Sequence, residues 1–387
     1  MPLAVSSKQI AAFRLTRHHL LNQTYGDAAS VAGDIAGAQA QVLSAAQLSI
    51  WARTRNEKLQ TLDDALWKKR KLVRAWCMRR TMFLLPSDEL ALFIRGTSKR
   101  PEYNLEWAQA RVSSKQQLDK LLESIIEILR QPSTRTNIAN SLKSQGYRLK
   151  SKAGGGWGST RSVPWVEVGG TFLPVGFLLH TVAAVHAICS GPNSGAESTY
   201  VRADSWLPRW KDMPREQAEE RLLVRYLRAF GPATITDYAI WVGLYIRDAK
   251  EIWSRIEENI ALVEVDGHNA GILESDLPDQ GSAKIDESTV RLLPNFDTFL
   301  LGHKSHRNVV EENFHKKIYR SQGWVTPVVL VVGRALGVWS YVVRKNELEV
   351  RVTPFSKFSS GVKSQIRQEA TRLGEFLGED SVKTVFQ

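Results

Sequence analysis

Cysteine is scarce in this chain: only Cys77 and Cys189 occur among 387 residues. Neither lies in a Cys-x-x-Cys pair or has a histidine at ligand spacing, which argues against a zinc site. So few cysteines in a chain of this length also fit a reducing cytoplasm. We therefore expect a cytoplasmic protein without a metal ion or other cofactor.

Signals for membrane insertion and for common catalytic motifs are also missing. The first residues lack the basic start and the long apolar core of a secretory signal. The most apolar run, residues 172–189, contains Pro174 and two histidines and is short for a spanning helix, so it predicts a buried strand and helix. The sequence holds no Gly-x-x-x-x-Gly-Lys-Ser/Thr, no Gly-x-Ser-x-Gly and no His-Glu-x-x-His motif.

Acidic residues are outnumbered. The chain has 52 Lys and Arg against 40 Asp and Glu, a net charge of +12, which favours a polyanionic partner, with nucleic acid ahead of an anionic membrane surface. Many basic soluble proteins bind no DNA, so the charge alone does not decide. Residues 53–80 are the most basic stretch, with ten basic against three acidic residues. That stretch predicts either a solvated basic face or a flank that follows phosphates.

Apolar periodicity, caps and turn residues predict an order of elements. Helices are expected at residues 8–22, 45–53 (capped by Ser44), 115–130, 134–146, 215–230, 234–244 (capped by Thr234) and 248–258. Strands are expected at 80–85 (before a helix capped by Ser87), 261–266, 327–332, 337–343 and 348–353, with a glycine-rich wing at 153–158 and a closing helix at 359–377. Helix, turn, helix and strands occur in this order twice, which is typical of winged helices.

The stretch with the clearest potential for chemistry is Ala38-Gln39-Ala40-Gln41. Glutamines two positions apart lie on different faces of a helix but point the same way in an extended segment. Gly33 and Gly37 just before them favour an irregular approach. Two amide side chains would then converge at the mouth of the following helix. The alternative is an ordinary polar loop edge.

Five segments in order resemble the AlkZ-like (YcaQ/AlkX-related) family of winged-helix DNA glycosylases. They are Gly37-Ala-Gln-Ala-Gln41 with Trp51-Ala-Arg53 after it, Leu72-Val-Arg-Ala-Trp-Cys-Met-Arg-Arg-Thr81, residues 226–244 with Phe230-Gly-Pro, residues 292–307 with Leu300-Leu-Gly-His-Lys-Ser-His-Arg307, and Val331-Val-Gly-Arg-Ala-Leu-Gly-Val-Trp339 with Val352-Thr-Pro-Phe355. Two departures are Arg80-Thr-Met-Phe83, which lacks a histidine common after this strand, and His303-Lys-Ser-His-Arg307, which lacks the acid of the family's run.

The resemblance implies an α+β fold, mostly α, with tandem winged-helix domains in a C-shaped arrangement and a small β-rich C-terminal domain. The expected division is an N-terminal winged-helix-like domain (1–115), a second winged helix (116–214), a third (215–290) and the C-terminal domain (291–387). The family's catalytic Gln-apolar-Gln motif falls on Gln39, Ala40 and Gln41.

The expected activity is therefore that of a monofunctional DNA glycosylase that excises N7-alkylpurines, with unhooking of interstrand crosslinks left open. An amide oxygen can accept a hydrogen bond from a water molecule, so one glutamine would position the hydrolytic water. We expect Gln41 to do so while Gln39 assists or contacts the deoxyribose, with the reverse assignment nearly as well supported. No lysine stands beside them, so we expect no Schiff base.

The expected partner is double-stranded DNA with an alkylated purine, with no membrane partner, and the protein is expected to be a nucleoid-associated monomer. Candidate DNA contacts are Arg79, Arg80, Lys304, His306 and Arg307, each of which could instead be an ordinary solvated charge. The rival function is that of a non-catalytic winged-helix DNA-binding protein or transcription regulator. Residues 234–244 offer Ile, Tyr, Ala, Trp and Val, a poor face for reading bases, which favours the glycosylase.

Overall fold

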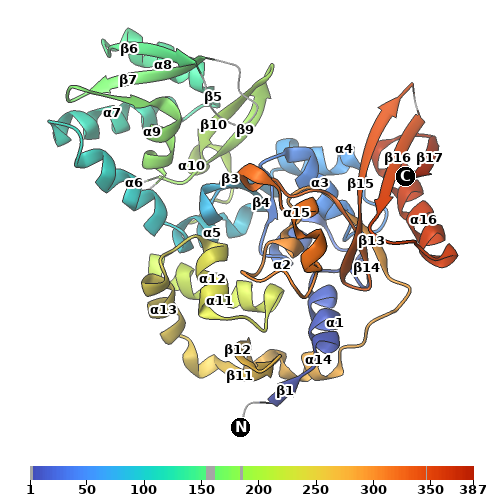
Figure 1. Ribbon diagram of the computed structural model, residues 1–387. Helices are drawn as coiled ribbons and strands as arrows, with labels where there is room; N and C mark the ends of the chain where they lie inside the picture. Colours follow the sequence, from blue (N-terminus) through green and yellow to red (C-terminus); the bar gives the residue numbers. More distant parts are fainter. Residues whose placement is uncertain (1–2, 154–161, 184–185, 346) are drawn as a thin grey trace.

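The computed structural model describes residues 3–153, 162–183, 186–345 and 347–387, and it mixes helices and strands throughout (Figure 1). This confirms the mixed α and β class. Within these ranges every helix is too short or too polar to span a bilayer, and the apolar run at 172–189 forms the predicted strand and helix.

The N-terminal part of the chain builds one half of a six-stranded sheet. Its elements are β1 (Leu3–Val5), α1 (Ser7–Arg17), α2 (Ala28–Asp34), β2 (Ala38–Gln39), α3 (Leu43–Trp51), α4 (Leu59–Asp63), β3 (Leu72–Trp76), β4 (Met82–Pro86), α5 (Leu90–Gly96) and α6 (Lys99–Gln109). All five residues of β4 are buried, as expected of a strand covered on both faces.

Three predicted helix boundaries in this part are wrong. The first helix ends at Arg17 rather than at residue 22, because His19 takes a left-handed conformation with φ 52°. Ser44 does not cap α3: Leu43 is already helical, so Val42 occupies the cap position without a side-chain bond. Ser87 caps no helix either, because a 3₁₀ turn (Ser87–Glu89) precedes α5.

The next part of the chain contains a helix pair and a small sheet and completes the six-stranded sheet. Its elements are α7 (Lys115–Ile128), β5 (Ser133–Thr134), α8 (Arg135–Ser144), β6 (Leu149–Ala153), β7 (Ser162–Val168), β8 (Thr171–Pro174), α9 (Val175–Val182), β9 (Ile188–Ser194), β10 (Glu197–Arg202) and α10 (Ala203–Trp206). The predicted glycine wing falls largely on residues 154–161, outside the described residues, but strands β6 and β7 flank it.

The six-stranded sheet crosses from one part of the chain to the other, with strand order β2-β4-β3-β9-β10-β5. The junction is the pairing of Ala75 in β3 with Cys189 in β9. Cys77 and Cys189 are both free and buried, and burial raises the pKa of the Cys77 thiol to about 12. β2, which carries Gln39, lies at the outer edge of this sheet.

The third part follows its prediction closely. Its elements are α11 (Arg215–Phe230), α12 (Ile235–Val242), α13 (Ile246–Ser254), β11 (Ile260–Val265), β12 (His268–Leu273) and α14 (Leu277–Ser282). Thr234 caps α12, and its side chain and that of Asp237 bond reciprocally to each other's backbone. The β1 strand pairs with β11, so the start of the chain completes this sheet.

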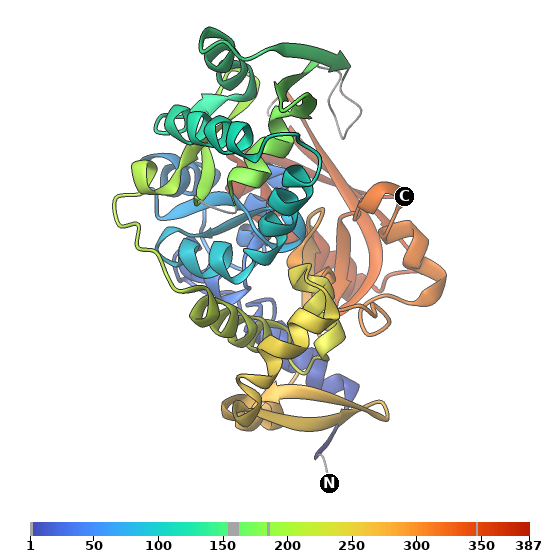
Figure 2. The same ribbon diagram turned by 90° about the vertical axis from the view of Figure 1, so that its left-hand side faces the viewer.

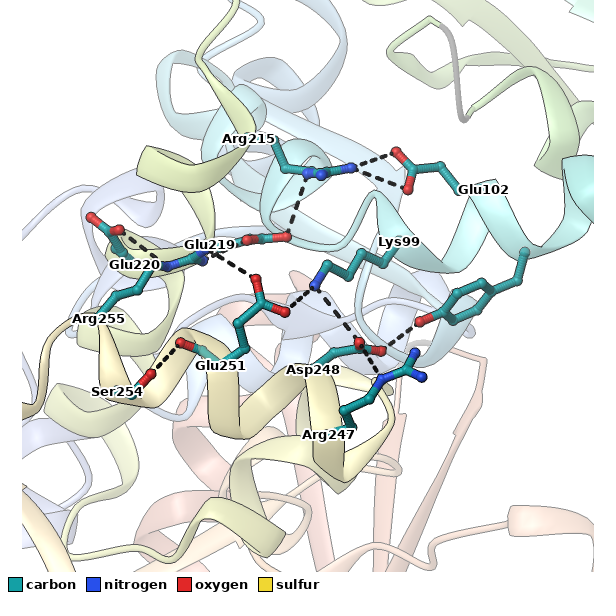
Figure 3. A network of polar contacts seen from close by, with 11 residues as sticks. Lys99, Glu102, Arg215, Glu219, Glu220, Arg247, Asp248, Glu251, Ser254 and Arg255 are labelled. Carbon is teal, nitrogen blue, oxygen red and sulfur yellow. Dashed lines mark hydrogen bonds and ion pairs between the residues drawn. The ribbon is translucent and has the colours of Figure 1, made fainter.

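A network of charged side chains holds α6, α11 and α13 together (Figure 3). Asp248 accepts a hydrogen bond from the Tyr103 hydroxyl at 2.6 Å and lies 3.8 Å from Nζ of Lys99. Arg255 contacts Glu219 at 2.6 Å on the other side of the network. Because the partners belong to three helices, these bonds fix α13 against the rest of the protein.

The C-terminal part is a five-stranded sheet covered by one long helix. Its elements are β13 (Val290–Leu293), α15 (His315–Ile318), β14 (Val328–Val331), β15 (Arg334–Arg344), β16 (Glu347–Pro354), α16 (Ser360–Leu377) and β17 (Ser381–Phe386). The helix predicted to close the chain is followed by a strand. Gly378 ends α16 in a left-handed conformation, φ 80°, and turns the chain back so that β17 pairs in parallel with β16.

The parts lie in a consistent arrangement in the two views. The region from α7 to β10, in teal and green, occupies one end of the molecule, and β11 and β12, in yellow, occupy the other (Figure 1, Figure 2). The largest core combines the segment around α2 and α3 with the C-terminal sheet and α16.

Candidate active site

Gln39 is placed by the edge strand β2. Gln39 is opposite Phe83 of β4, and the N–H of Ala40 donates to the carbonyl of Met82 at 2.6 Å, so the extended pairing continues through Ala40. Gly37 enters this strand with φ 95°, and a Cβ there would lie 2.8 Å from Cδ2 of Leu85. The expectation of an extended backbone after an irregular approach is therefore confirmed.

The amide of Gln39 is held by an arginine. Its Oε1 accepts a hydrogen bond from Nη2 of Arg79 at 2.8 Å, and only 8% of Gln39 is exposed. Nη1 of Arg79 donates to the backbone carbonyl of Trp241, in the last turn of α12. Burial lowers the pKa of the Arg79 guanidinium to about 10, which still leaves it charged at neutral pH.

Gln41 lies two residues on and is exposed. Nε of Arg74 donates to the carbonyl of Ala40 at 3.0 Å, and its Nη2 reaches the carbonyl of Gln41 at 3.4 Å. Among the described residues the side chain of Gln41 has no hydrogen-bond partner. Its amide is therefore available to a ligand, with its backbone fixed by an arginine that the sequence interpretation missed.

An aromatic cluster on β3, which β4 separates from β2, was also missed. Trp76, on the same face of β3 as Arg74, stacks on Tyr200 with ring centroids 4.8 Å apart and lies 4.3 Å from the ring of His180. Burial and the charges of Arg80 and Arg135 lower the pKa of His180 to about 4. Arg74 and Trp76 are two positions apart in a strand, so their side chains lie on the same face of the sheet. This spacing in the sequence was the signal for a half-buried face of β3.

Of the two neighbouring arginines predicted to contact DNA, Arg79 and Arg80, only Arg80 is exposed. It donates to Oδ1 of Asn104 at 2.9 Å. Arg79 and Arg80 are consecutive left-handed residues, with φ 54° and 58°, in the turn between β3 and β4. This turn sends one guanidinium toward Gln39 and the other toward α6.

The second predicted contact group, residues 303–307, follows the 3₁₀ helix Thr298–Leu300. The backbone N–H of Lys304 donates to Oδ1 of Asp237 at 2.8 Å, and its side chain is exposed. Arg307 is also exposed, 3.4 Å from Glu312. His306 stacks on Tyr319 with centroids 3.9 Å apart, and burial, with the nearby His315, lowers its pKa to about 4. His306 therefore offers a neutral ring rather than a charge.

The basic stretch at residues 53–80 is only partly exposed, so a solvated face or a flank that follows phosphates would include only some of its charges. Arg53 is fully buried against Asp297, and Arg70 lies over the ring of Trp206 at 3.8 Å. The lysines of this stretch, such as Lys69, are exposed. Several of these charges stabilise the fold and are not available to phosphates.

The described residues contain no group of three or more His, Cys, Asp or Glu side chains that could hold a metal ion. The site is instead built from amides, guanidinium groups and aromatic rings. Such groups bind a polar, anionic and base-bearing ligand.

Comparison with known proteins agrees with this composition. The family model described as "DNA glycosylase AlkZ-like" matches residues 32–376. An interstrand DNA cross-link repair glycosylase of Streptomyces sahachiroi is 27% identical over 394 residues, covering 97% of this chain and 98% of that protein. The solved structure of the Streptomyces sahachiroi DNA glycosylase AlkZ superposes over all of both chains with a TM-score of 0.80 at 24% identity.

Proposed function

Because the chain belongs to the AlkZ-like DNA glycosylase family, we propose that it excises N7-alkylated purines from double-stranded DNA with Gln39 and Gln41 at the reacting bond. Membership confirms the resemblance found in the sequence and makes the protein a DNA glycosylase, so the transcription-regulator alternative has no support. The observation that carries the glutamine assignment is the position of Gln39 on the edge strand, bonded to Arg79, two residues from an exposed Gln41.

The proposed chemistry follows from the charge of the substrate. An N7-alkylated purine is cationic, so when the bond between sugar C1′ and base N9 breaks, its electron pair goes to the base, which leaves neutral. The oxygen of a water molecule then bonds to C1′ and a proton passes to solvent. No strong general acid is needed. A neutral amide can hold this water and stabilise the oxocarbenium-like sugar without titrating.

The proposal extends to the architecture. Tandem winged helices at 116–214 and 215–290, after an N-terminal unit at 1–115, are supported by the orders α7-α8-β6-β7 and α11-α12-α13-β11-β12. A C-shaped arrangement with the β-rich domain at 291–387 is supported by the placement of the 116–214 unit at one end of the molecule and of β11 and β12 at the other (Figure 2). The protein would act as a monomer. Its DNA substrate would lie against the inner side of the C, near Arg80, Lys304 and Arg307.

Interstrand crosslinks are the second substrate class. The Streptomyces relative is named for crosslink repair. A crosslink joined through N7 leaves the same cationic purine, and the same bond would be cut to unhook it. The exposed side chain of Gln41 is consistent with a site that is open enough for a base still tied to the opposite strand.

Base release from defined duplexes tests the proposal. One duplex carries a single N7-methylguanine, a second carries an N7-linked interstrand crosslink, and a third is unmodified. We expect release or unhooking from both damaged duplexes, none from the third, and no covalent protein–DNA species after borohydride. Tight binding without release from either damaged duplex would overturn the proposal, and a borohydride-trapped species would overturn its monofunctional chemistry.

A further inference from the structure

Arg79 is a half-buried cation whose hydrogen-bond partners are neutral. Its guanidinium donates to the amide oxygen of Gln39 and to the carbonyl of Trp241. Among the described residues no carboxylate forms an ion pair with it. A charge in such a place persists only where other interactions compensate its desolvation, and the carbonyl end of α12 supplies part of that compensation.

The contact with Arg79 determines which way the Gln39 amide faces. A guanidinium has only donors, so the amide atom 2.8 Å from Nη2 must be the oxygen. Nε2 of Gln39 then points to the other side of the amide. Nε2 has no partner among the described residues and is absent from their buried unpaired atoms, so it reaches solvent. Gln39 therefore presents a donor to the site.

We propose that Arg79 is a positioning residue, which fixes Gln39 with its amide N–H groups toward the DNA and leaves Gln41 to hold the hydrolytic water. This rests on the proposed function. A donor suits an acceptor oxygen of the deoxyribose or its phosphate, and the polarisation of the amide by Arg79 strengthens that donor. Gln41 has no such partner, so its oxygen remains available to accept from water.

The assignment also gives α12 a part in the site. The carbonyl of Trp241 holds the second arm of the guanidinium, and the left-handed turn at Arg79, φ 54°, aims the side chain between α12 and β2. Gln39 is thus oriented by a residue of the turn between β3 and β4, and α12, a helix from residues 215–290, holds that residue in place.

Single-turnover base release from the N7-methylguanine duplex, with the dissociation constant measured in parallel, tests the role of Arg79. Arg79→Met should slow release between about 10- and 100-fold while the dissociation constant stays within about twofold. Arg95→Met, which removes an arginine bonded to Asp212 on the surface, is the matched control and should release base at the wild-type rate.

A double-mutant cycle separates positioning from other roles. In a Gln39→Ala background, Arg79→Met should change the rate by less than about twofold, because its effect runs through Gln39. Independent, multiplying losses would overturn the proposal. The proposal would also be overturned if Arg79→Met kept the wild-type rate at saturating enzyme but bound DNA more weakly and with less dependence on salt. That result would identify Arg79 as a phosphate contact.

Two further variants keep the test decisive if Arg79→Met fails to fold. Arg79→Lys keeps the charge but offers one ammonium to two acceptors, and should lose part of the rate with unchanged DNA affinity. Gln39→Glu keeps an oxygen for Arg79 but removes the N–H donor, and should be as slow as Gln39→Ala. A Gln39→Glu protein with wild-type rate would overturn the donor assignment. Absence of base release by wild type contradicts the proposed function itself, a result distinct from all of these.

Discussion

Arg53 and Asp297 are 244 positions apart in the chain and form an ion pair in which neither side chain is exposed. Both guanidinium arms take part: Nη2 lies 2.7 Å from Oδ1 and Nη1 lies 2.8 Å from Oδ2. The Ser49 hydroxyl donates to Oδ2 at 2.7 Å. The pair joins the residues just after α3, the helix that follows the glutamine segment, to the C-terminal part of the chain.

Removing one partner of this pair leaves an unpaired buried charge. We expect Asp297→Ala to lower the free energy of unfolding by about 3–5 kcal/mol in urea denaturation. The control is Asp212→Ala, which breaks a pair with Arg95 in which the acid is 52% exposed and should lower it by no more than about 1 kcal/mol. Equal effects of the two variants would contradict a structural role for the buried pair.

Because of His303, the folded protein should lose stability in acid. Its Nε2 donates to the carbonyl of Phe230 at 2.9 Å, and burial, with the nearby Arg14 charge, lowers its pKa from 6.5 to about 3. Below pH 6.5 the unfolded chain binds a proton that the folded chain does not. The contribution of this ring to the free energy of unfolding is therefore fully present above pH 6.5 and is lost as the pH falls toward 3.

His303→Gln should remove that part of the decline. Between about pH 7 and about pH 5 the fall in the free energy of unfolding should be smaller than in wild type by about 2 kcal/mol. His268→Gln, at an exposed position in β12, is the control for loss of a histidine. An unchanged pH dependence in His303→Gln would show that this ring is not buried in the neutral form.

Lys304 and Arg307 should contact phosphates. Each alanine variant should weaken DNA binding equally for all sequences and reduce the slope of log K against log salt by about 1. Lys8→Ala removes an exposed lysine paired with Glu287 near the N-terminus, and should leave the slope unchanged. A slope unaffected by both Lys304→Ala and Arg307→Ala would place the DNA elsewhere.

Gly37 should be required for the geometry of Gln39. A Cβ at this position meets side-chain atoms of Leu85 at 2.8 Å and of Phe83 at 3.0 Å, so Gly37→Ala must displace either β2 or these side chains beneath it. We expect at least about a tenfold loss of the base-release rate. Gly146→Ala has nearly the same backbone strain, with φ 90° against 95°, but open space around it, and should keep the wild-type rate. Equal rates in the two variants would show that the position of β2 is not critical.

Much of the fold could be predicted from local signals. The capping of α12 by Thr234 and Asp237, and the apolar face of α7, depend on residues three or four apart and were predicted correctly. The pairing of β1 with β11 was not predicted, because a partner more than 200 residues away leaves no local pattern. The strand β17, which pairs with β16 on the other side of α16, was not predicted either.

The candidate site divides in the same way. The irregular approach to the Gln39 segment was expected from Gly33 and Gly37, and an extended segment was the form in which two glutamines at this spacing would point the same way. The bond from Arg79 to Gln39 was not expected, because it depends on two consecutive left-handed residues that are not glycine. Arg53 shows the opposite error: its place in a basic run suggested solvent or phosphate, while Asp297 draws it into the core.

The most direct test is single-turnover base release from an N7-methylguanine duplex by wild type, Gln39→Ala and Gln41→Ala, with DNA affinity measured for each. We expect Gln41→Ala to lose at least about 100-fold in rate, and Gln39→Ala to be clearly slowed, with dissociation constants close to wild type. Wild-type rates in both variants would contradict a glycosylase that works through this pair.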